Sequence, residues 1–232
     1  GKGRPGWHIE CSAMSMRYLG APFDIHCGAV DNIFQHHENE IAQSECATNQ
    51  PFVKVWLHGE HLIVEGEKMS KSKGNFFTLR DLLTRASSPR AIRYTLASVP
   101  YRKPLNFTHE SVRQSQSAIE RLEDFLLRYE TEKFSEGLNT EVEDTAHAAH
   151  DKFVAGLDDD LNTAQALGAI FEFVHAGNVA MGEGRLREGN RPAIDGLFAD
   201  FQKIFAVLQY PTHQILHSEI EALIEERQQA RR

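Results

Sequence analysis

The fold is indicated first by the stretch Phe23-Asp24-Ile25-His26-Cys27-Gly28-Ala29-Val30-Asp31. Its first four residues predict a strand, because aromatic and β-branched residues are typical of strands, and the small residues that follow predict a turn. Ligands of open α/β sheets bind beyond the carboxyl ends of the strands. His26 and Asp31 are therefore candidates to contact a nucleotide or its ribose, although an Asp in such a turn can also serve the backbone alone.

Outward from this stretch, strands and helices alternate. Further strands are predicted at residues 52–57 and 62–64, and helices at residues 9–18 and 35–46. This alternation favours an α/β layer with a mostly parallel sheet, which we expect to extend to about residue 83.

The second part of the chain is predicted to be helical. Strand signals fade after about residue 84, and Pro89 is placed to open a helix in its first turn. Apolar spacing, with Asn162 and Ser218 as caps, predicts helices at residues 110–129, 144–157, 162–179, 194–208 and 218–229. We expect an α/β fold followed by an all-α part, with domains at residues 1–83, 84–136 and 137–232.

The composition is that of an ordinary globular protein, with 25% charged and 41% hydrophobic residues. The chain has no run of eighteen apolar residues, so we predict no membrane span. Three cysteines are too few for a disulfide framework, which favours a reducing cytoplasm. The first residues are not followed by the apolar core of a signal peptide, so we predict no secretory signal. Because the chain begins without Met, we expect a fragment of a longer protein.

Basic residues concentrate in one window, although the net charge of the chain is −8. Between residues 68 and 103 one acid, Asp81, accompanies nine basic residues, here called the basic belt: Lys68, Lys71, Lys73, Arg80, Arg85, Arg90, Arg93, Arg102 and Lys103. A basic belt on an acidic protein indicates a polyanion site, such as nucleotide phosphates or an RNA backbone. A solvated helix face has the same composition, so both interpretations stay open.

A candidate metal site is formed by Cys11 and the run His36-His37-Glu38-Asn39-Glu40. Residues four apart share a helix face, so His36 and Glu40 can converge on one point, but His37 is only three residues from Glu40 and spacing cannot choose between the histidines. Thiolate, imidazole and carboxylate are all zinc ligands, and Cys11 could close the site from another helix. Adjacent histidines are also commonly solvated.

A Lys-rich loop follows the third predicted strand, with the sequence Glu67-Lys68-Met69-Ser70-Lys71-Ser72-Lys73-Gly74-Asn75. Ammonium groups among small polar residues can close on a triphosphate and neutralise charge that develops in the transition state. A plain solvated turn is the alternative.

Taken together, these blocks carry a family resemblance. Gly3-Arg4-Pro5-Gly6-Trp7-His8-Ile9-Glu10-Cys11-Ser12-Ala13-Met14, the His-His-Glu-Asn-Glu run and Lys-Met-Ser-Lys-Ser resemble the signature blocks of cysteinyl-tRNA synthetases in order and spacing. The resemblance continues through residues 101–107 and 158–163 and covers essentially the whole chain. It implies the C-terminal half of a class I synthetase Rossmann-type catalytic domain, then a helical stem-contact region and a truncated helical bundle.

The resemblance also implies an activity. Enzymes of this family, cysteine--tRNA ligases, make cysteinyl adenylate from L-cysteine and ATP (with Mg2+) and transfer the cysteine to tRNA(Cys). Zn2+ selects the thiol, because a soft thiolate binds this metal directly and an apolar pocket separates near-isosteres only weakly. A cytoplasmic protein, monomeric at full length, is expected.

Site residues follow by motif from the resemblance. It gives Cys11, His36 and Glu40 as zinc ligands. Lys71 matches the lysine that contacts ATP, and Lys68 and Lys71 are expected to stabilise the leaving pyrophosphate.

The resemblance also gives pocket residues, since Trp7 and His26 match positions that line the cysteine pocket.

Other parts of the family pattern are altered in this sequence or lie outside it. Cys27 and Ala29 stand where the family has glycine, and Gln35 stands where proline is common, which puts nucleotide affinity in question. The family's fourth zinc ligand and its His-x-Gly-His motif belong to the earlier half of the domain, so we expect the chain alone not to form cysteinyl adenylate.

Two other functions are alternatives to this assignment. A related enzyme ligates cysteine to an amino sugar in thiol biosynthesis with the same catalytic fold and zinc, but it normally lacks the long helical region. A non-catalytic zinc- or RNA-binding remnant is the second alternative.

Overall fold

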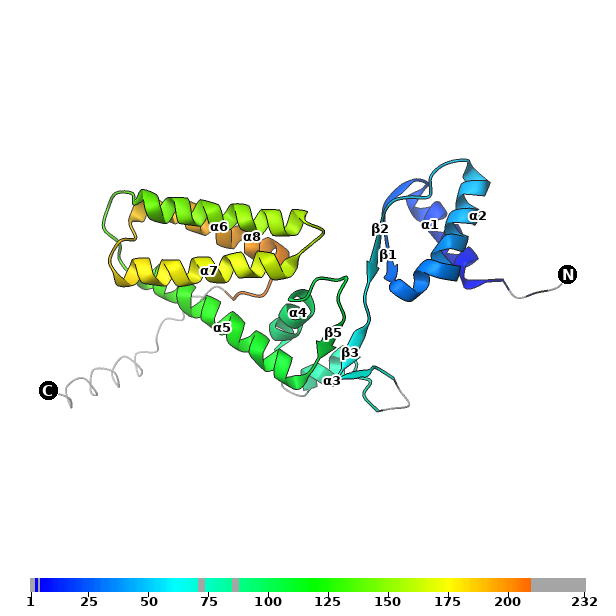
Figure 1. Cartoon of the computed structure of the whole chain (residues 1–232), viewed down its shortest axis with the longest axis horizontal. Helices are drawn as coiled ribbons and strands as arrows, with labels where there is room; N and C mark the ends of the chain where they lie inside the picture. Colours follow the sequence, from blue (N-terminus) through cyan, green and yellow to red (C-terminus); the bar gives the residue numbers. More distant parts are fainter. Residues whose placement is uncertain (1–2, 4, 71–73, 85–87, 210–232) are drawn as a thin grey trace.

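The computed structural model describes residues 3, 5–70, 74–84 and 88–209 of the 232-residue chain. Its described part is elongated, with an α/β layer near the N-terminus, a small middle region and a helical bundle following one another along the long axis (Figure 1). Within the described ranges no helix is both long and apolar enough to cross a membrane. The predicted helix at residues 218–229 lies outside them.

The first layer consists of α1 (Trp7–Leu19), β1 (Phe23–Ala29), α2 (Glu38–Thr48) and β2 (Val53–Gly59). As predicted, β1 and β2 are parallel, and Ile25 pairs with Val55 and His26 with Trp56. Successive strand residues point to opposite faces. His26 and Trp56 lie on the face that α2 covers, where the two rings stack at 4.7 Å. On the other face, Ile25 and Val55 are 55% and 49% exposed, so this face is open among the described residues.

The chain enters α2 differently from the prediction. A helix was predicted from residue 35, but residues Ile33–His37 form a π-helical turn, η2, that is interrupted at Phe34 and Gln35. Gln35 has a φ of 73°, a left-handed conformation that side chains with a Cβ rarely adopt. This break follows the 3-10 turn η1 (Val30–Asn32) and precedes His36 and His37, both of which are buried.

A second small sheet forms the middle region. It has the order β4-β3-β5, with β3 (Leu62–Val64), β4 (Glu67–Lys68) and β5 (Leu105–Phe107). β3 is antiparallel to β4 and parallel to β5. The expectation that strands end before residue 84 was therefore wrong, since a three-residue strand is too short for its apolar alternation to be recognised.

Helices make up the rest of the described chain. They are α3 (Leu79–Thr84), α4 (Pro89–Ala97), α5 (His109–Thr131), α6 (Thr140–Asp158), α7 (Thr163–Gly182) and α8 (Arg191–Phe205), with the 3-10 turn η4 (Glu188–Asn190) before α8. The predictions that Pro89 begins a helix and that Asn162 caps one are confirmed. α8 begins at Arg191, whereas the apolar pattern predicted a start at residue 194. The pattern missed the first turn because that turn is polar and contains a proline, which is favourable at a helix start.

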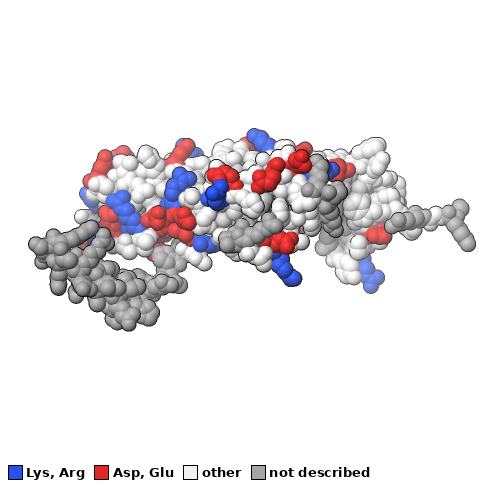
Figure 2. Space-filling model, turned by 90° about the horizontal axis from the view of Figure 1, so that it is seen from below, with Lys and Arg blue, Asp and Glu red and all other residues white. Residues whose placement is uncertain are grey.

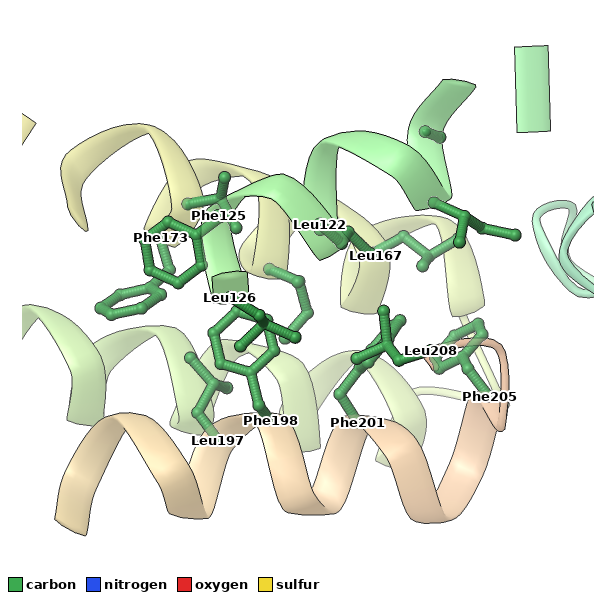
Figure 3. Close-up of a cluster of buried hydrophobic side chains, with 14 of the residues drawn as sticks. Leu122, Phe125, Leu126, Leu167, Phe173, Leu197, Phe198, Phe201, Phe205 and Leu208 are labelled. Carbon is green, nitrogen blue, oxygen red and sulfur yellow. The ribbon is translucent and has the colours of Figure 1, made fainter. Parts of the chain in front are cut away.

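The main core lies where α5, α6, α7 and α8 meet. Aromatic side chains fill much of it, including Phe125, Phe173, Phe198 and Phe201 (Figure 3). The rings of Phe125 and Phe198 stack at 5.5 Å, and Phe173 meets Phe125 edge to face at 6.0 Å. Such contacts between fully buried rings stabilise the bundle.

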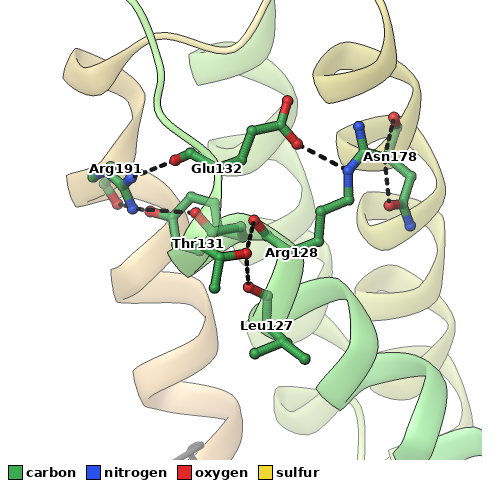
Figure 4. A network of polar contacts seen from close by, with 7 residues as sticks. Leu127, Arg128, Thr131, Glu132, Asn178 and Arg191 are labelled. Atoms are coloured by element: carbon green, nitrogen blue, oxygen red, sulfur yellow. Dashed lines mark hydrogen bonds and ion pairs between the residues drawn. The ribbon is translucent and has the colours of Figure 1, made fainter. Parts of the chain in front are cut away.

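Polar contacts join the helix ends around this core. Arg191 lies 2.7 Å from Glu188 and donates to the carbonyl oxygens of Tyr129 and Glu132, while Arg128 bonds Glu132 at 2.9 Å (Figure 4). These bonds satisfy carbonyl groups at the end of α5 that have no partner inside the helix. They tie the beginning of α8 to the end of α5.

Candidate metal centre

Three predicted ligands converge in the first layer. Cys11 lies on α1, His36 is the last residue but one of the interrupted turn η2, and Glu40 lies in the first turn of α2. One donor atom from each lies within 4.8 Å of the other two. Glu40 is 0% exposed and His36 is 8% exposed, and Cys11 is half-buried, so the cluster is largely shielded from solvent.

The carboxylate of Glu40 lies between two imidazoles. Its Oε2 atom lies 2.5 Å from Nε2 of His26, and its Oε1 atom lies 2.7 Å from Nε2 of His36. The first contact is a hydrogen bond, but Oε1 has no hydrogen-bond partner of acceptable geometry despite its full burial. A buried carboxylate oxygen without a partner is costly, and a cation among Oε1, the imidazole of His36 and the sulfur of Cys11 would satisfy it. The donor set therefore fits a zinc ion.

The thiol of Cys11 is held in its neutral form when no cation is bound. Burial raises its pKa, and the negative charge and hydrogen-bonding capacity of Glu40 raise it further. Because zinc binds the thiolate, metal binding at this cluster must release the thiol proton.

A second group of side chains adjoins the first and was not found from the sequence. His26, His37 and Glu40 also bring ligand-type atoms within 4.8 Å of one another. His37 Nδ1 lies 2.8 Å from Nε2 of His58 on β2. Burial, together with the neighbouring histidines, lowers the pKa of His37 to about 4, so its ring is neutral near pH 7.

Strand alternation could have pointed to part of this group. Trp56 and His58 are two residues apart on β2 and therefore face the same side of the sheet as His26. Burial lowers the pKa of His58, and the positive charge of Arg102 lowers it further. His37, in contrast, was visible in the sequence, but the helical interpretation could not separate its role from that of His36.

Gly28 is the glycine of this strand that the packing requires. A Cβ atom built on Gly28 would lie 2.4 Å from Cε1 of His37. Its neighbours Cys27 and Ala29, which replace glycines of the family pattern, are exposed and half-buried. The two replacements thus flank the close approach, and the position in contact with His37 keeps its glycine.

The remaining predicted residues lie outside the donor cluster. Trp7 stacks on His36 at 3.9 Å while remaining 61% exposed. Asp31 is exposed in η1, beyond the carboxyl end of β1. Lys68 is exposed on β4, in the other sheet, and Lys71 lies outside the described residues.

Several cations of the basic belt are engaged within the protein. Arg90 pairs with Glu123 and donates to the carbonyl oxygen of Val207 at 3.1 Å. Arg93 donates to the carbonyl oxygens of Phe205 and Ile204 at the end of α8, and Arg102 pairs with an acid of the bundle. Figure 2 shows Lys and Arg interspersed with Asp and Glu on one face of the molecule. Through the bonds described above, Arg90, Arg93 and Arg102 attach the helical bundle to the rest of the chain.

Comparison with known proteins assigns both parts of the chain. Residues 1–117 match the family described as tRNA synthetases class I (C) catalytic domain, and residues 152–209 match the DALR domain. The chain is 51% identical over 235 residues to the "Cysteine--tRNA ligase" of Solibacter usitatus (strain Ellin6076), covering 100% of this chain and 50% of that protein. It is 45% identical over 233 residues to the protein of the same name from Chlamydia felis (strain Fe/C-56), covering 100% of this chain and 49% of the relative. The chain thus spans about half the length of these curated relatives.

Solved structures agree at the level of the fold. The Agrobacterium radiobacter K84 agnB2 LeuRS, in a ternary complex with tRNA and LeuAMS, superposes with a TM-score of 0.63 at 18% identity over 82% of this chain and 28% of that chain. Mycobacterium tuberculosis methionyl-tRNA synthetase, in complex with methionyl-adenylate, gives a TM-score of 0.56 at 17% identity over 81% of this chain and 40% of that chain. The predicted fold class and the family resemblance are confirmed. Since the family match covers 117 of the 232 residues, the chain belongs to the class I (C) tRNA synthetase catalytic-domain family.

Proposed function

We propose that the chain is part of a cysteine--tRNA ligase and supplies the second half of its catalytic domain together with adjoining helical domains. The complete enzyme would activate L-cysteine with ATP and Mg2+ as cysteinyl adenylate and transfer it to tRNA(Cys). The names of the relatives support this assignment. The main structural observation in its favour is the convergence of Cys11, His36 and Glu40.

Within this proposal, Cys11, His36 and Glu40 hold Zn2+. When bound, Zn2+ would supply a Lewis acid of borderline softness, which favours the thiolate of cysteine over the hydroxyl of serine. His26 bonds the Oε2 atom of Glu40, and the indole ring of Trp7 stacks on His36. An imidazole partner of this kind orients a ligating carboxylate.

The nucleotide side of the site is proposed by motif. Lys68 and Lys71 would neutralise the charge of the departing pyrophosphate, and Asp31 would face the nucleotide from the end of β1. His26 was expected to contact the substrate, and its bond to Glu40 supports a role next to the metal as well. Residues 84–136 and 137–232 would face tRNA, in a cytoplasmic enzyme that is monomeric at full length.

The helical part favours the tRNA ligase over the amino-sugar ligase. The DALR match at residues 152–209 lies in the region that the amino-sugar enzymes normally lack. A zinc- or RNA-binding remnant would keep the same cluster without catalysis. We expect this chain alone to be inactive in cysteine-dependent ATP–pyrophosphate exchange.

Cobalt substitution tests the proposed site directly. The chain loaded with Co2+ should show sulfur-to-cobalt charge-transfer absorption, which L-cysteine should increase and L-serine should leave unchanged. Without added cysteine, the cobalt-loaded Cys11→Ala variant should lose this absorption, whereas the Cys46→Ala variant, which changes an exposed cysteine, should keep it. Equal spectra of Cys11→Ala and the parent chain would refute the proposed ligand set.

A further inference from the structure

A small polar cluster joins two connections that are far apart in the sequence. Tyr101 and Arg102 lie between α4 and β5, and Asp160 lies between α6 and α7. The Tyr101 hydroxyl donates to Oδ1 of Asp160 at 2.6 Å, and the Arg102 guanidinium bonds both carboxylate oxygens. The guanidinium carbon also lies 5.0 Å from the centre of the Tyr101 ring. This cluster fixes the α6–α7 end of the bundle, which in Figure 1 is the end nearer to α4.

The cluster is also tied to the strand that carries His58. The backbone N–H of Glu60, directly after β2, donates to the carbonyl oxygen of Tyr101 at 2.7 Å. The Tyr101–Arg102 segment therefore touches the end of β2 through its backbone and the bundle through its side chains. Any displacement of Arg102 from Asp160 loosens the bundle from this segment.

The backbone conformation at Asp160 does not depend on the carboxylate of this residue. Asp160 and Leu161 have φ values of 52° and 56°, which are uncommon for residues with side chains. Backbone bonds hold them there: the N–H of Leu161 donates to Leu157 at 3.0 Å, and the N–H of Asn162 donates to Gly156 at 2.9 Å. An Asp160→Asn substitution thus removes the charge and leaves the loop, because Asn tolerates positive φ as well as Asp does.

The ion pair is accessible to solvent and can be exchanged. The side chains of Arg102 and Asp160 are 60% and 49% exposed, and exposed ion pairs are weak. A guanidinium fork binds a phosphate with the same geometry as a carboxylate. Lys103 next to it is exposed and has no ion-pair partner in the described part of the chain, so a polyanion that reaches Arg102 meets a second cation.

We propose that Asp160 is an intramolecular competitor of RNA: its carboxylate holds Arg102 in the free protein, and a backbone phosphate of the tRNA takes its place. This inference rests on the proposed function only for the identity of the RNA. Exchange of the carboxylate for the phosphate breaks the Arg102–Asp160 pair and leaves the Tyr101 hydroxyl in contact with Asp160, so RNA binding is coupled to a weaker attachment of the α6–α7 end of the bundle.

The test measures the affinity of the whole 232-residue chain for a tRNA(Cys) transcript at fixed, low salt by fluorescence anisotropy. The variants are Asp160→Asn, Asp159→Asn, Arg102→Gln and the double variant Arg102→Gln/Asp160→Asn. Asp159 is the matched control, because it is exposed, carries the same charge and lies one residue away. We expect Asp160→Asn to bind about two- to fivefold more tightly than Asp159→Asn, the range that an exposed pair supplies. In the Arg102→Gln background the advantage should vanish.

Each outcome decides between the ideas. Equal affinities for Asp160→Asn and Asp159→Asn, or an advantage that survives without Arg102, would overturn the competition. So would failure of the parent chain to bind RNA at low salt. The cobalt–cysteine experiment is independent: its failure would remove the ligase assignment while a tighter Asp160→Asn variant would still support an RNA-exchanged pair. Circular dichroism of every variant should match that of the parent, which excludes a folding artefact.

Discussion

Nε2 of His26 lies 2.5 Å from Oε2 of Glu40, which leaves Oε1 of the same carboxylate facing His36. One oxygen is thus held by the protein, and the other is available to a cation. This division places His26 outside the donor set and gives it control of the ligand's orientation.

Substitution of His26 by Ala should weaken zinc binding without removing a ligand. Loss of an imidazole that orients a ligating carboxylate typically costs about 10–100-fold in metal affinity. Competition with a chromophoric chelator measures this affinity. His61→Ala serves as the control, since His61 lies after β2 and outside both ligand clusters of the described residues. An unchanged affinity in His26→Ala would contradict the orienting role.

Gly28→Ala should destabilise the first layer. The new Cβ would lie 2.4 Å from the ring of His37, which is buried against His58 and Trp56 and cannot turn away freely. Overpacking of this kind costs about 1–3 kcal/mol of unfolding free energy. Urea denaturation monitored by tryptophan fluorescence should show a lower midpoint, whereas Cys27→Ala on the same strand should unfold as the parent does. A Gly28→Ala midpoint equal to the parent's would show that His37 can move.

Two glycines of α7 should respond to alanine in opposite directions. A Cβ on Gly177 would lie 2.8 Å from the buried ring of Phe125, so Gly177→Ala should lower stability by about 1–3 kcal/mol. Gly168 is exposed with nothing within 4 Å of its Cβ position, so Gly168→Ala should raise stability by about 0.5–1 kcal/mol through helix propensity. Thermal unfolding of both variants gives the comparison, and the same sign for both would contradict the packing around Phe125.

The carboxyl group of Asp160 should titrate below the ordinary range. Hydrogen bonds from Arg102 and then Tyr101 lower its pKa. Since the folded pKa is lower than the unfolded one, the contact is complete above the unfolded pKa, and it is lost as the pH falls through the folded pKa. Carbon-detected NMR of the Asp160 carboxyl should give a midpoint that rises in Arg102→Gln, and a midpoint that does not move would show that Arg102 is not its partner in solution.

The sequence was sufficient for the parts that depend on periodicity and residue type. The parallel pair β1–β2, the helices of the bundle and the cap at Asn162 follow from apolar spacing and capping preferences. Family motifs named Cys11, His36 and Glu40, and the fold brings these three donors together.

Other features depend on contacts that no local pattern contains. The left-handed conformation of Gln35 interrupts the expected helix just before the two buried histidines. β5 is a strand because it pairs with β3, which lies more than forty residues earlier in the chain. The bond between His37 and His58 joins a turn to a strand and could be seen only once the two were packed.

The uncovered side of the β1–β2 pair has a practical consequence for handling the chain. Among the described residues, β1 and β2 pair only with each other, and the apolar residues Ile25 and Val55 lie on an open surface, so this pair is a template on which further strands can add. We therefore expect concentrated solutions to self-associate through this ribbon, and a Val55→Lys substitution to keep them monodisperse in light scattering.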